Sequence, residues 1–146
     1  GTEHGMVVQG AVGESGAASG GHSGGGGIDE LTTTGLTRIT TVREGKVSTS
    51  YFDACSLGLE HSRLESLQVD SVEASAEVVR GVLGGEGGAA RDMVCLNAAA
   101  ALVVAEVASD FAGALKLAAE SIDSGAAGAS LDTLIRITHA DLTPAA

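Results

Sequence analysis

The pattern of hydrophobic and polar residues changes along the chain, from strand-like alternation near the start to a helical period further on. The run Met6-Val7-Val8 ends at Gln9-Gly10 and predicts a buried strand, because it is short, apolar and rich in β-branched residues. Residues 36–52 alternate apolar or β-branched with polar positions around Glu44-Gly45. That pattern predicts a β-hairpin. Residues 53–68 show no clear period and are expected to be irregular, with room for one helical turn.

The helical period begins near residue 70, and we expect four helices within residues 70–138. Asp70 is the expected N-cap of the first helix, with Glu73 three residues later completing a capping box. The stretch Met93–Ala105 is apolar nearly all round, which predicts a central buried helix. The expected starts are after Asp70, near Ala89, after Ser109-Asp110 and near Ala127, and the expected ends are near Gly84-Gly85, Val107, Ser124-Gly125 and Thr138.

A glycine-rich segment, residues 10–27, separates the first strand from the hairpin, and half of its positions are glycine. It has no periodic apolar face, which predicts a flexible loop. A phosphate-binding loop is the alternative, but that motif needs a lysine, and the first basic residue is Arg38. His22 lies within the segment without a second His or Cys at metal-ligand spacing, so we expect it to be solvated.

Strands followed by helices indicate a layered α/β or α+β architecture, and we interpret residues 1–146 as one partial α/β domain. About three short strands make a small platform for four apolar helices. Further strands are therefore expected from elsewhere. The sequence starts with Gly1 rather than Met, which predicts a processed chain or a part of something longer.

Composition removes several classes of function. The chain has 19 acidic and 8 basic residues, a net charge of −11, and three aromatic residues, which argues against a nucleic-acid partner. Its longest apolar stretch is shorter than the roughly 18–20 residues of a membrane span, and no secretory signal is recognisable. The two cysteines, Cys55 and Cys95, are too few for a disulfide framework and indicate reduced thiols in the cytoplasm.

The main candidate site is the acidic pair Asp29-Glu30, which follows the glycine-rich segment and precedes Thr32-Thr33-Thr34. Adjacent side chains of a strand point to opposite faces, but in a turn both carboxylates can converge. Two carboxylates with nearby hydroxyls and waters suit Mg²⁺. The alternative is an acidic pair that is only solvated. The threonine hydroxyls are expected either to bind phosphate oxygens or to cap a turn.

Other polar residues are expected to have structural roles. Asn97 interrupts the most apolar helix, so if buried it needs partners, and we expect it to tie a neighbouring loop to that helix. Arg91 and Asp92 are expected to form local ion pairs or caps. Arg38 lies on a strand and faces either a phosphate or solvent.

No catalytic or cofactor-binding residue can be assigned from motifs. Cys55 and Cys95 have no histidine near them in the sequence, and no nucleophile elbow is present. No cluster of cysteine and histidine has the spacing of a zinc site, so none is expected.

Three separated blocks of the sequence carry a resemblance to a known family. The blocks are GIDELTTTGLTRITTVREGKV, RGVLGGEGGAARDMVCLNAAAALVVAE and ESIDSGAAGASLDTLI. Together, and in this order, they resemble the anthranilate phosphoribosyltransferases. The likeness covers roughly residues 2–138 apart from the glycine-rich segment, and it matches the C-terminal portion of the family.

The resemblance implies a phosphoribosyltransferase and nucleoside-phosphorylase-like catalytic domain. Enzymes of this family transfer the phosphoribosyl group of phosphoribosyl pyrophosphate to the amine of anthranilate, in tryptophan biosynthesis, and need Mg²⁺. The family's Asp-Glu pair holds that ion, which carries over to Asp29 and Glu30 of this chain. The resemblance also implies a cytoplasmic enzyme that is a homodimer when complete.

Several family features do not occur in this sequence. The Gly-Thr-Gly-Gly-Asp loop, the Lys-His-Gly-Asn segment, the anthranilate-binding arginine and the helical N-terminal domain would have to come from a missing N-terminal part or a partner chain. Gln9 stands where the family has His, and Leu36 where Pro is common. We therefore expect the chain alone to be inactive. The alternatives are a truncated non-catalytic homologue acting as an interaction module, and a related pyrimidine nucleoside phosphorylase.

Overall fold

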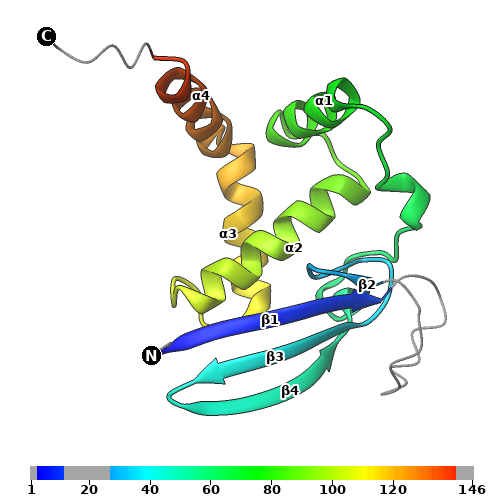
Figure 1. The fold of residues 1–146 in the computed structure, drawn as a ribbon, viewed down its shortest axis with the longest axis vertical. Helices are drawn as coiled ribbons and strands as arrows, with labels where there is room; N and C mark the ends of the chain where they lie inside the picture. The colour runs from blue at the N-terminus through cyan, green and yellow to red at the C-terminus, as the bar shows by residue number, and fades with distance from the viewer. Residues whose placement is uncertain (1–2, 12–26, 141–146) are drawn as a thin grey trace, which may run out of the picture.

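The computed structural model describes residues 3–11 and 27–140, so His22 and most of the glycine-rich segment lie outside the described residues. Its strands form one sheet at one end of the molecule, and the four helices gather on one side of that sheet (Figure 1). The strands are β1 (His4–Ala11), β2 (Gly27–Ile28), β3 (Thr37–Arg43) and β4 (Lys46–Phe52). The expected α/β class is confirmed.

The sheet has the order β2-β1-β3-β4, and all its strand pairs are antiparallel. The predicted hairpin is formed by β3 and β4, with Arg43 paired to Lys46 across a two-residue turn. Glu44 and Gly45 have φ angles of 50° and 75°. Positive φ at both turn positions matches the right-handed twist of the flanking strands, which explains why glycine follows the glutamate here.

The β1 strand is present as predicted, but it is buried on one face only. Met6 and Val8 pack against the core, whereas Val7 is 71% exposed. Successive side chains of a strand point to opposite faces, and the helices cover only the face of Met6 and Val8. The outer face also carries Val47 and Tyr51, which are both exposed.

Four α-helices and two short 3₁₀ turns follow the hairpin. They are η1 (Ala54–Leu57), η2 (Leu64–Ser66), α1 (Val72–Leu83), α2 (Ala89–Val104), α3 (Phe111–Asp123) and α4 (Ala126–Thr138). The α2 helix joins two hydrophobic clusters, which confirms it as the central helix. Its Leu96 and Ala100 pack with Ile39 of the sheet, while its Cys95 packs with Ile122 of α3. No helix in the described part of the chain is long and apolar enough to cross a membrane.

The helix ends agree with the sequence in some places and differ in others. The third helix begins at Ser109-Asp110 as expected, and its cap is Asp110, which accepts a hydrogen bond from the Gly113 N–H at 2.7 Å. The cap of α1 is Ser71 rather than Asp70, and its hydroxyl accepts from the Ala74 N–H at 3.1 Å. Glu73 is therefore one position too early for a capping box. The α2 helix ends at Val104, earlier than expected.

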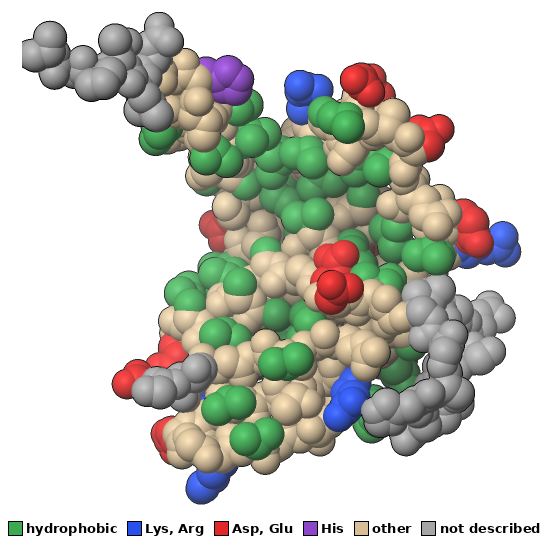
Figure 2. Space-filling view, in the orientation of Figure 1, with side chains coloured by type: hydrophobic (Ala, Val, Ile, Leu, Met, Phe, Trp, Pro, Cys, Tyr) green, Lys and Arg blue, Asp and Glu red, His purple; other side chains and the backbone are tan. Residues whose placement is uncertain are grey.

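The apolar faces of α1 and α4 line an open groove of about 630 Å³. Figure 2 shows hydrophobic side chains gathered in the hollow between these two helices. Val79 of α1 is 45% exposed and Ile135 of α4 is 47% exposed. The described residues thus leave the apolar face of α4 uncovered.

Candidate functional site

The segment that carries the acidic pair is held to helix α2 by one side chain. The Leu31 N–H donates to Asn97 Oδ1 at 2.9 Å, and Asn97 Nδ2 donates back to the Leu31 carbonyl at 2.8 Å. A further hydrogen bond from Nδ2 to the Met93 carbonyl, at 3.0 Å, fixes the amide against its own helix. Leu31 itself is buried. The role expected for Asn97, tying a loop to the helix, is confirmed.

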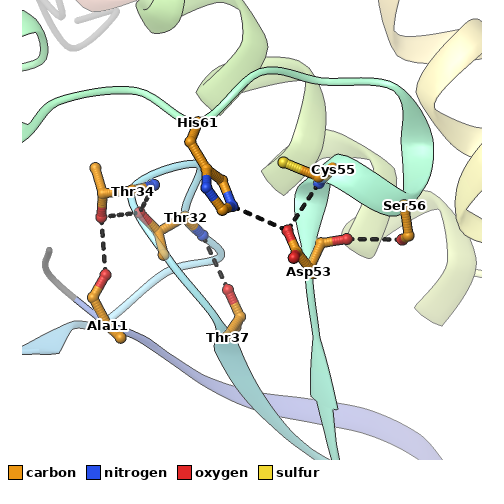
Figure 3. A network of polar contacts seen from close by, with 8 residues as sticks. All are labelled: Ala11, Thr32, Thr34, Thr37, Asp53, Cys55, Ser56 and His61. Atoms are coloured by element: carbon orange, nitrogen blue, oxygen red, sulfur yellow. Dashed lines mark hydrogen bonds and ion pairs between the residues drawn. The ribbon is translucent and has the colours of Figure 1, made fainter. Parts of the chain in front are cut away.

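The threonine run forms a buried turn next to this segment (Figure 3). Thr32 Oγ1 accepts a hydrogen bond from the Thr34 N–H at 3.0 Å, and Thr37 Oγ1 accepts from the Thr32 N–H at 3.1 Å. The Thr34 hydroxyl donates to the Ala11 carbonyl at 2.8 Å. These hydroxyls stabilise the turn and attach it to the end of β1. Of the two roles left open for them, the structure shows turn capping.

Glycine is needed where β1 passes this turn. A Cβ added at Gly10 would lie 2.7 Å from Thr32 Cγ2 and 2.9 Å from the Glu30 carbonyl oxygen. Real Cβ atoms do not approach other heavy atoms so closely, so any other residue would push the strand and the turn apart. Gly10 therefore sets the position of the backbone that carries the acidic pair.

Asp29 and Glu30 follow β2 directly, and both are exposed. Neither carboxylate makes a hydrogen bond or an ion pair with the residues that the structure describes, so their oxygens are available to a cation. Two carboxylates form an all-oxygen donor set that fits Mg²⁺, an ion that keeps several water ligands. The hydroxyls of Thr32 and Thr34 are committed to the turn, and the Thr33 hydroxyl is buried without a hydrogen-bond partner among the described residues. The carboxylates and water would therefore provide the ligands on this side.

The structure also shows the surroundings of the other polar residues considered above, Arg91, Asp92 and Arg38. Arg91 donates to Asp123 of α3 at 2.8 Å, and this hydrogen bond raises the pKa of Arg91. The ion pair is thus not local, as had been expected, but joins two helices. Burial raises the pKa of Asp92, and it also raises the pKa of the buried Cys95. Arg38 is exposed on the outer face of the sheet.

A second polar cluster was missed by the sequence analysis. It consists of Asp53, Cys55 and His61, which we call the Asp53–Cys55–His61 cluster (Figure 3). Asp53 Oδ1 accepts from the Cys55 N–H at 2.9 Å and lies 3.1 Å from His61 Nε2. His61, six residues after Cys55, is thus a histidine neighbour that the sequence did not lead us to expect. The signal was present as Asp-x-Cys followed six residues later by His.

The charges within this cluster act on one another. The hydrogen bond from the Cys55 N–H, together with the one to His61, lowers the pKa of Asp53. Desolvation and the Asp53 carboxylate raise the pKa of the Cys55 thiol. Cys55 is exposed and not in a disulfide.

Comparison with known proteins identifies the class. The family model of the glycosyl transferase family, a/b domain, matches residues 2–128, and the chain belongs to this family. Among curated relatives, the anthranilate phosphoribosyltransferase of Arthrobacter sp. (strain FB24) is 45% identical over 119 residues, covering 77% of this chain and 34% of the relative. That of Streptomyces avermitilis is 40% identical over 139 residues, covering 92% of this chain and 39% of the relative.

Solved structures show the same likeness. Anthranilate phosphoribosyltransferase from Thermus thermophilus superposes with a TM-score of 0.68 at 29% identity, over 89% of this chain and 34% of that one. The enzyme from Saccharomyces cerevisiae in complex with PRPP and Mg has a TM-score of 0.65 at 24% identity, over 77% of this chain and 32% of that one, which shows the fold. The resemblance that the three sequence blocks indicate is confirmed. The chain spans about one third of the length of the curated relatives described above.

Proposed function

We propose that this chain is part of an anthranilate phosphoribosyltransferase and supplies Asp29 and Glu30 as ligands to Mg²⁺. One observation carries the assignment of these residues: Asn97 clamps Leu31 from both sides and leaves the two preceding carboxylates exposed. The complete enzyme would transfer the phosphoribosyl group of phosphoribosyl pyrophosphate to anthranilate, in tryptophan biosynthesis. The relatives are anthranilate phosphoribosyltransferases, which supports this substrate pair.

The contribution of this chain to the reaction would be one of positioning. When bound, Mg²⁺ supplies positive charge to the diphosphate leaving group. The Asn97 clamp holds the backbone at Leu31, and the threonine turn fixes the following residues. Asp29 and Glu30 then need to order only their own side chains to hold the ion. A preorganised ligand pair loses less conformational entropy on binding than a pair on a loose loop.

The proposal extends to assembly and location. The remaining two thirds of the relatives' length would supply the groups that bind the phosphates and anthranilate, from a further part of the protein or from a partner chain. A homodimeric complete enzyme and a cytoplasmic location also belong to this proposal. The two cysteines, which form no disulfide in the structure, agree with a reducing compartment. The relatives described above do not favour a nucleoside phosphorylase or a non-catalytic module.

A direct test joins this chain to the part of the Arthrobacter enzyme that it does not match. The joined protein is expected to consume anthranilate, followed by its fluorescence, when both phosphoribosyl pyrophosphate and Mg²⁺ are present. The intact Arthrobacter enzyme is the positive control, and the chain by itself is expected to show no turnover. A joined protein that folds and assembles but consumes no anthranilate would contradict the proposal.

A further inference from the structure

The Asp53–Cys55–His61 cluster combines three different metal-ligating groups on one short segment. A carboxylate oxygen, the thiol sulfur and an imidazole nitrogen all lie within 4.8 Å of one another. Figure 3 shows the side chains of Asp53 and His61 pointing toward one another, with the Cys55 side chain beside them. All three side chains lie between the end of β4 and the start of η2.

The backbone of this segment is fixed on both sides of the cluster. Asp53 caps η1 through the Cys55 N–H, and its carbonyl accepts from the Ser56 hydroxyl at 2.7 Å. Gly58 ends the turn with a φ of 83°, and its N–H donates to the Cys55 carbonyl at 3.0 Å. Beyond His61, the Ser62 N–H donates to the Thr33 carbonyl at 3.0 Å. The three side chains therefore start from anchored Cα positions.

The cluster is also open to an incoming cation. The side chains of His61 and Asp53 are 53% and 39% exposed, and Cys55 is exposed. A cation therefore reaches the three donor groups without any opening of the fold. The carboxylate of Glu60, next to His61 in the chain, adds negative charge that acts on Cys55.

We propose that the Asp53–Cys55–His61 cluster binds a divalent transition-metal ion of the Zn²⁺ class. The ligands would be Cys55 Sγ, a ring nitrogen of His61 and a carboxylate oxygen of Asp53, with water completing the shell. Ligand atoms around tetrahedral Zn²⁺ lie about 3.3–3.6 Å apart, given metal–ligand bonds of about 2.0–2.3 Å. Rotation of these exposed side chains would bring the ligand atoms from their present separations, within 4.8 Å, to the shorter separations around a bound ion.

The donor set decides which ion is bound. Thiolate and imidazole are soft or borderline ligands that select Zn²⁺, Co²⁺ and related ions, whereas Mg²⁺ prefers oxygen. On binding, the Cys55 thiol releases its proton to solvent, and the metal replaces the hydrogen bond between Asp53 and His61. This site is independent of the Asp29–Glu30 pair and does not rest on the proposed transferase activity.

Cobalt is a suitable probe, because a thiolate bound to Co²⁺ produces a charge-transfer band in the near ultraviolet. The full chain is prepared without a histidine tag, reduced and freed of metal, and then titrated with Co²⁺. We expect one ion per chain with a sulfur charge-transfer band, and displacement of Co²⁺ by Zn²⁺. A large excess of Mg²⁺ is expected to leave the band unchanged. Titration without a sulfur band, or displacement of the ion by Mg²⁺, would overturn the proposal.

Variants assign the ligands. Cys55→Ser is expected to abolish the band, and His61→Ala to weaken Co²⁺ binding by about tenfold or more. Asp53→Asn keeps an N-cap for η1, so weaker binding in this variant reports on ligation rather than on the turn. Asp132→Asn and His139→Ala remove exposed groups elsewhere and are the matched controls. A band that persists in folded Cys55→Ser, as judged by far-ultraviolet circular dichroism, would overturn the assignment.

Discussion

Asn97 pairs with the backbone of Leu31 in both directions, although 66 residues separate them. Its Oδ1 accepts from the Leu31 N–H and its Nδ2 donates to the Leu31 carbonyl. The side-chain amide of Asn97 thus pairs with the backbone of Leu31 as a neighbouring strand would, through one donor and one acceptor. Because Asp29 and Glu30 directly precede Leu31, this pairing fixes the base of the candidate metal site to the central helix.

Replacing Asn97 should cost more stability than a typical surface change. Asn97→Ala removes three hydrogen bonds and leaves the backbone groups of Leu31 without a protein partner, and we expect a loss of roughly 2–3 kcal/mol in the free energy of unfolding. Urea unfolding followed by circular dichroism measures this loss. Asn97→Asp keeps the acceptor but places a carboxylate oxygen against the Leu31 and Met93 carbonyls, so it should be no more stable than Asn97→Ala. A loss below about 0.5 kcal/mol in Asn97→Ala would show that the clamp contributes little.

Gly10 should tolerate no side chain. The Cβ of Gly10→Ala would collide with Thr32 and with the Glu30 carbonyl, and we expect a loss of about 1–3 kcal/mol in the free energy of unfolding. Gly87→Ala is the matched control, because a Cβ there meets nothing within 4 Å. The control should be neutral or slightly stabilising, since alanine restricts the unfolded chain. Equal effects of the two substitutions in urea unfolding would argue against the close approach at Gly10.

Local features were predictable from the sequence, because their causes are local. The hairpin follows from alternation around Glu44-Gly45, and the start of α3 follows from Ser109-Asp110. The α1 cap was misplaced because Asp70 and Ser71 are both good caps, and only the path of the chain decides between them. The exposure of Val7 could not be predicted, because it depends on which face of the sheet the helices cover.

The candidate site was predictable only in part. Burial of a polar side chain in an apolar helix demands partners, which is why the tying role of Asn97 could be predicted but Leu31 could not be named. The Asp53–Cys55–His61 cluster was missed because its spacing matches no zinc motif. It arises from two folded details, the 3₁₀ turn after Asp53 and the return of the chain at His61.

The ionisation of Asp92 should lower the stability of the folded protein. Burial raises its pKa in the folded protein above the ordinary value of 3.8, so the charged form is less favourable in the folded than in the unfolded state. Protonated Asp92 therefore favours the folded state. Its contribution to the free energy of unfolding is fully present below pH 3.8 and is lost as the pH rises through the pKa of Asp92 in the folded protein. Asp92→Asn should therefore stabilise the protein at pH 7 and change little at pH 3. The gain should be no more than about 1 kcal/mol, because solvent screens this half-buried carboxylate. Urea unfolding at both pH values measures this, and destabilisation at pH 7 would contradict it.

The two thiols should react at very different rates. Cys55 is exposed, whereas Cys95 is 4% exposed and lies in the cluster between α2 and α3. In the native protein we expect Ellman's reagent to titrate one thiol quickly and the second only after unfolding by urea. Cys55→Ser should remove the fast phase alone. Two fast thiols in the folded protein would mean that the helices separate readily.

The acidic pair should control the metal requirement once the chain is part of an active enzyme. In the protein joined to the Arthrobacter segment, Asp29→Ala and Glu30→Ala are each expected to raise the Mg²⁺ concentration needed for half-maximal activity by about tenfold or more. The reason is the loss of a charged ligand from a site that Mg²⁺ holds with few protein groups. Asp132→Asn, a change at an exposed acid in α4, should leave the requirement unchanged. Metal titrations of the rate measure this, and an unchanged requirement in both variants would show that Asp29 and Glu30 are solvated surface residues.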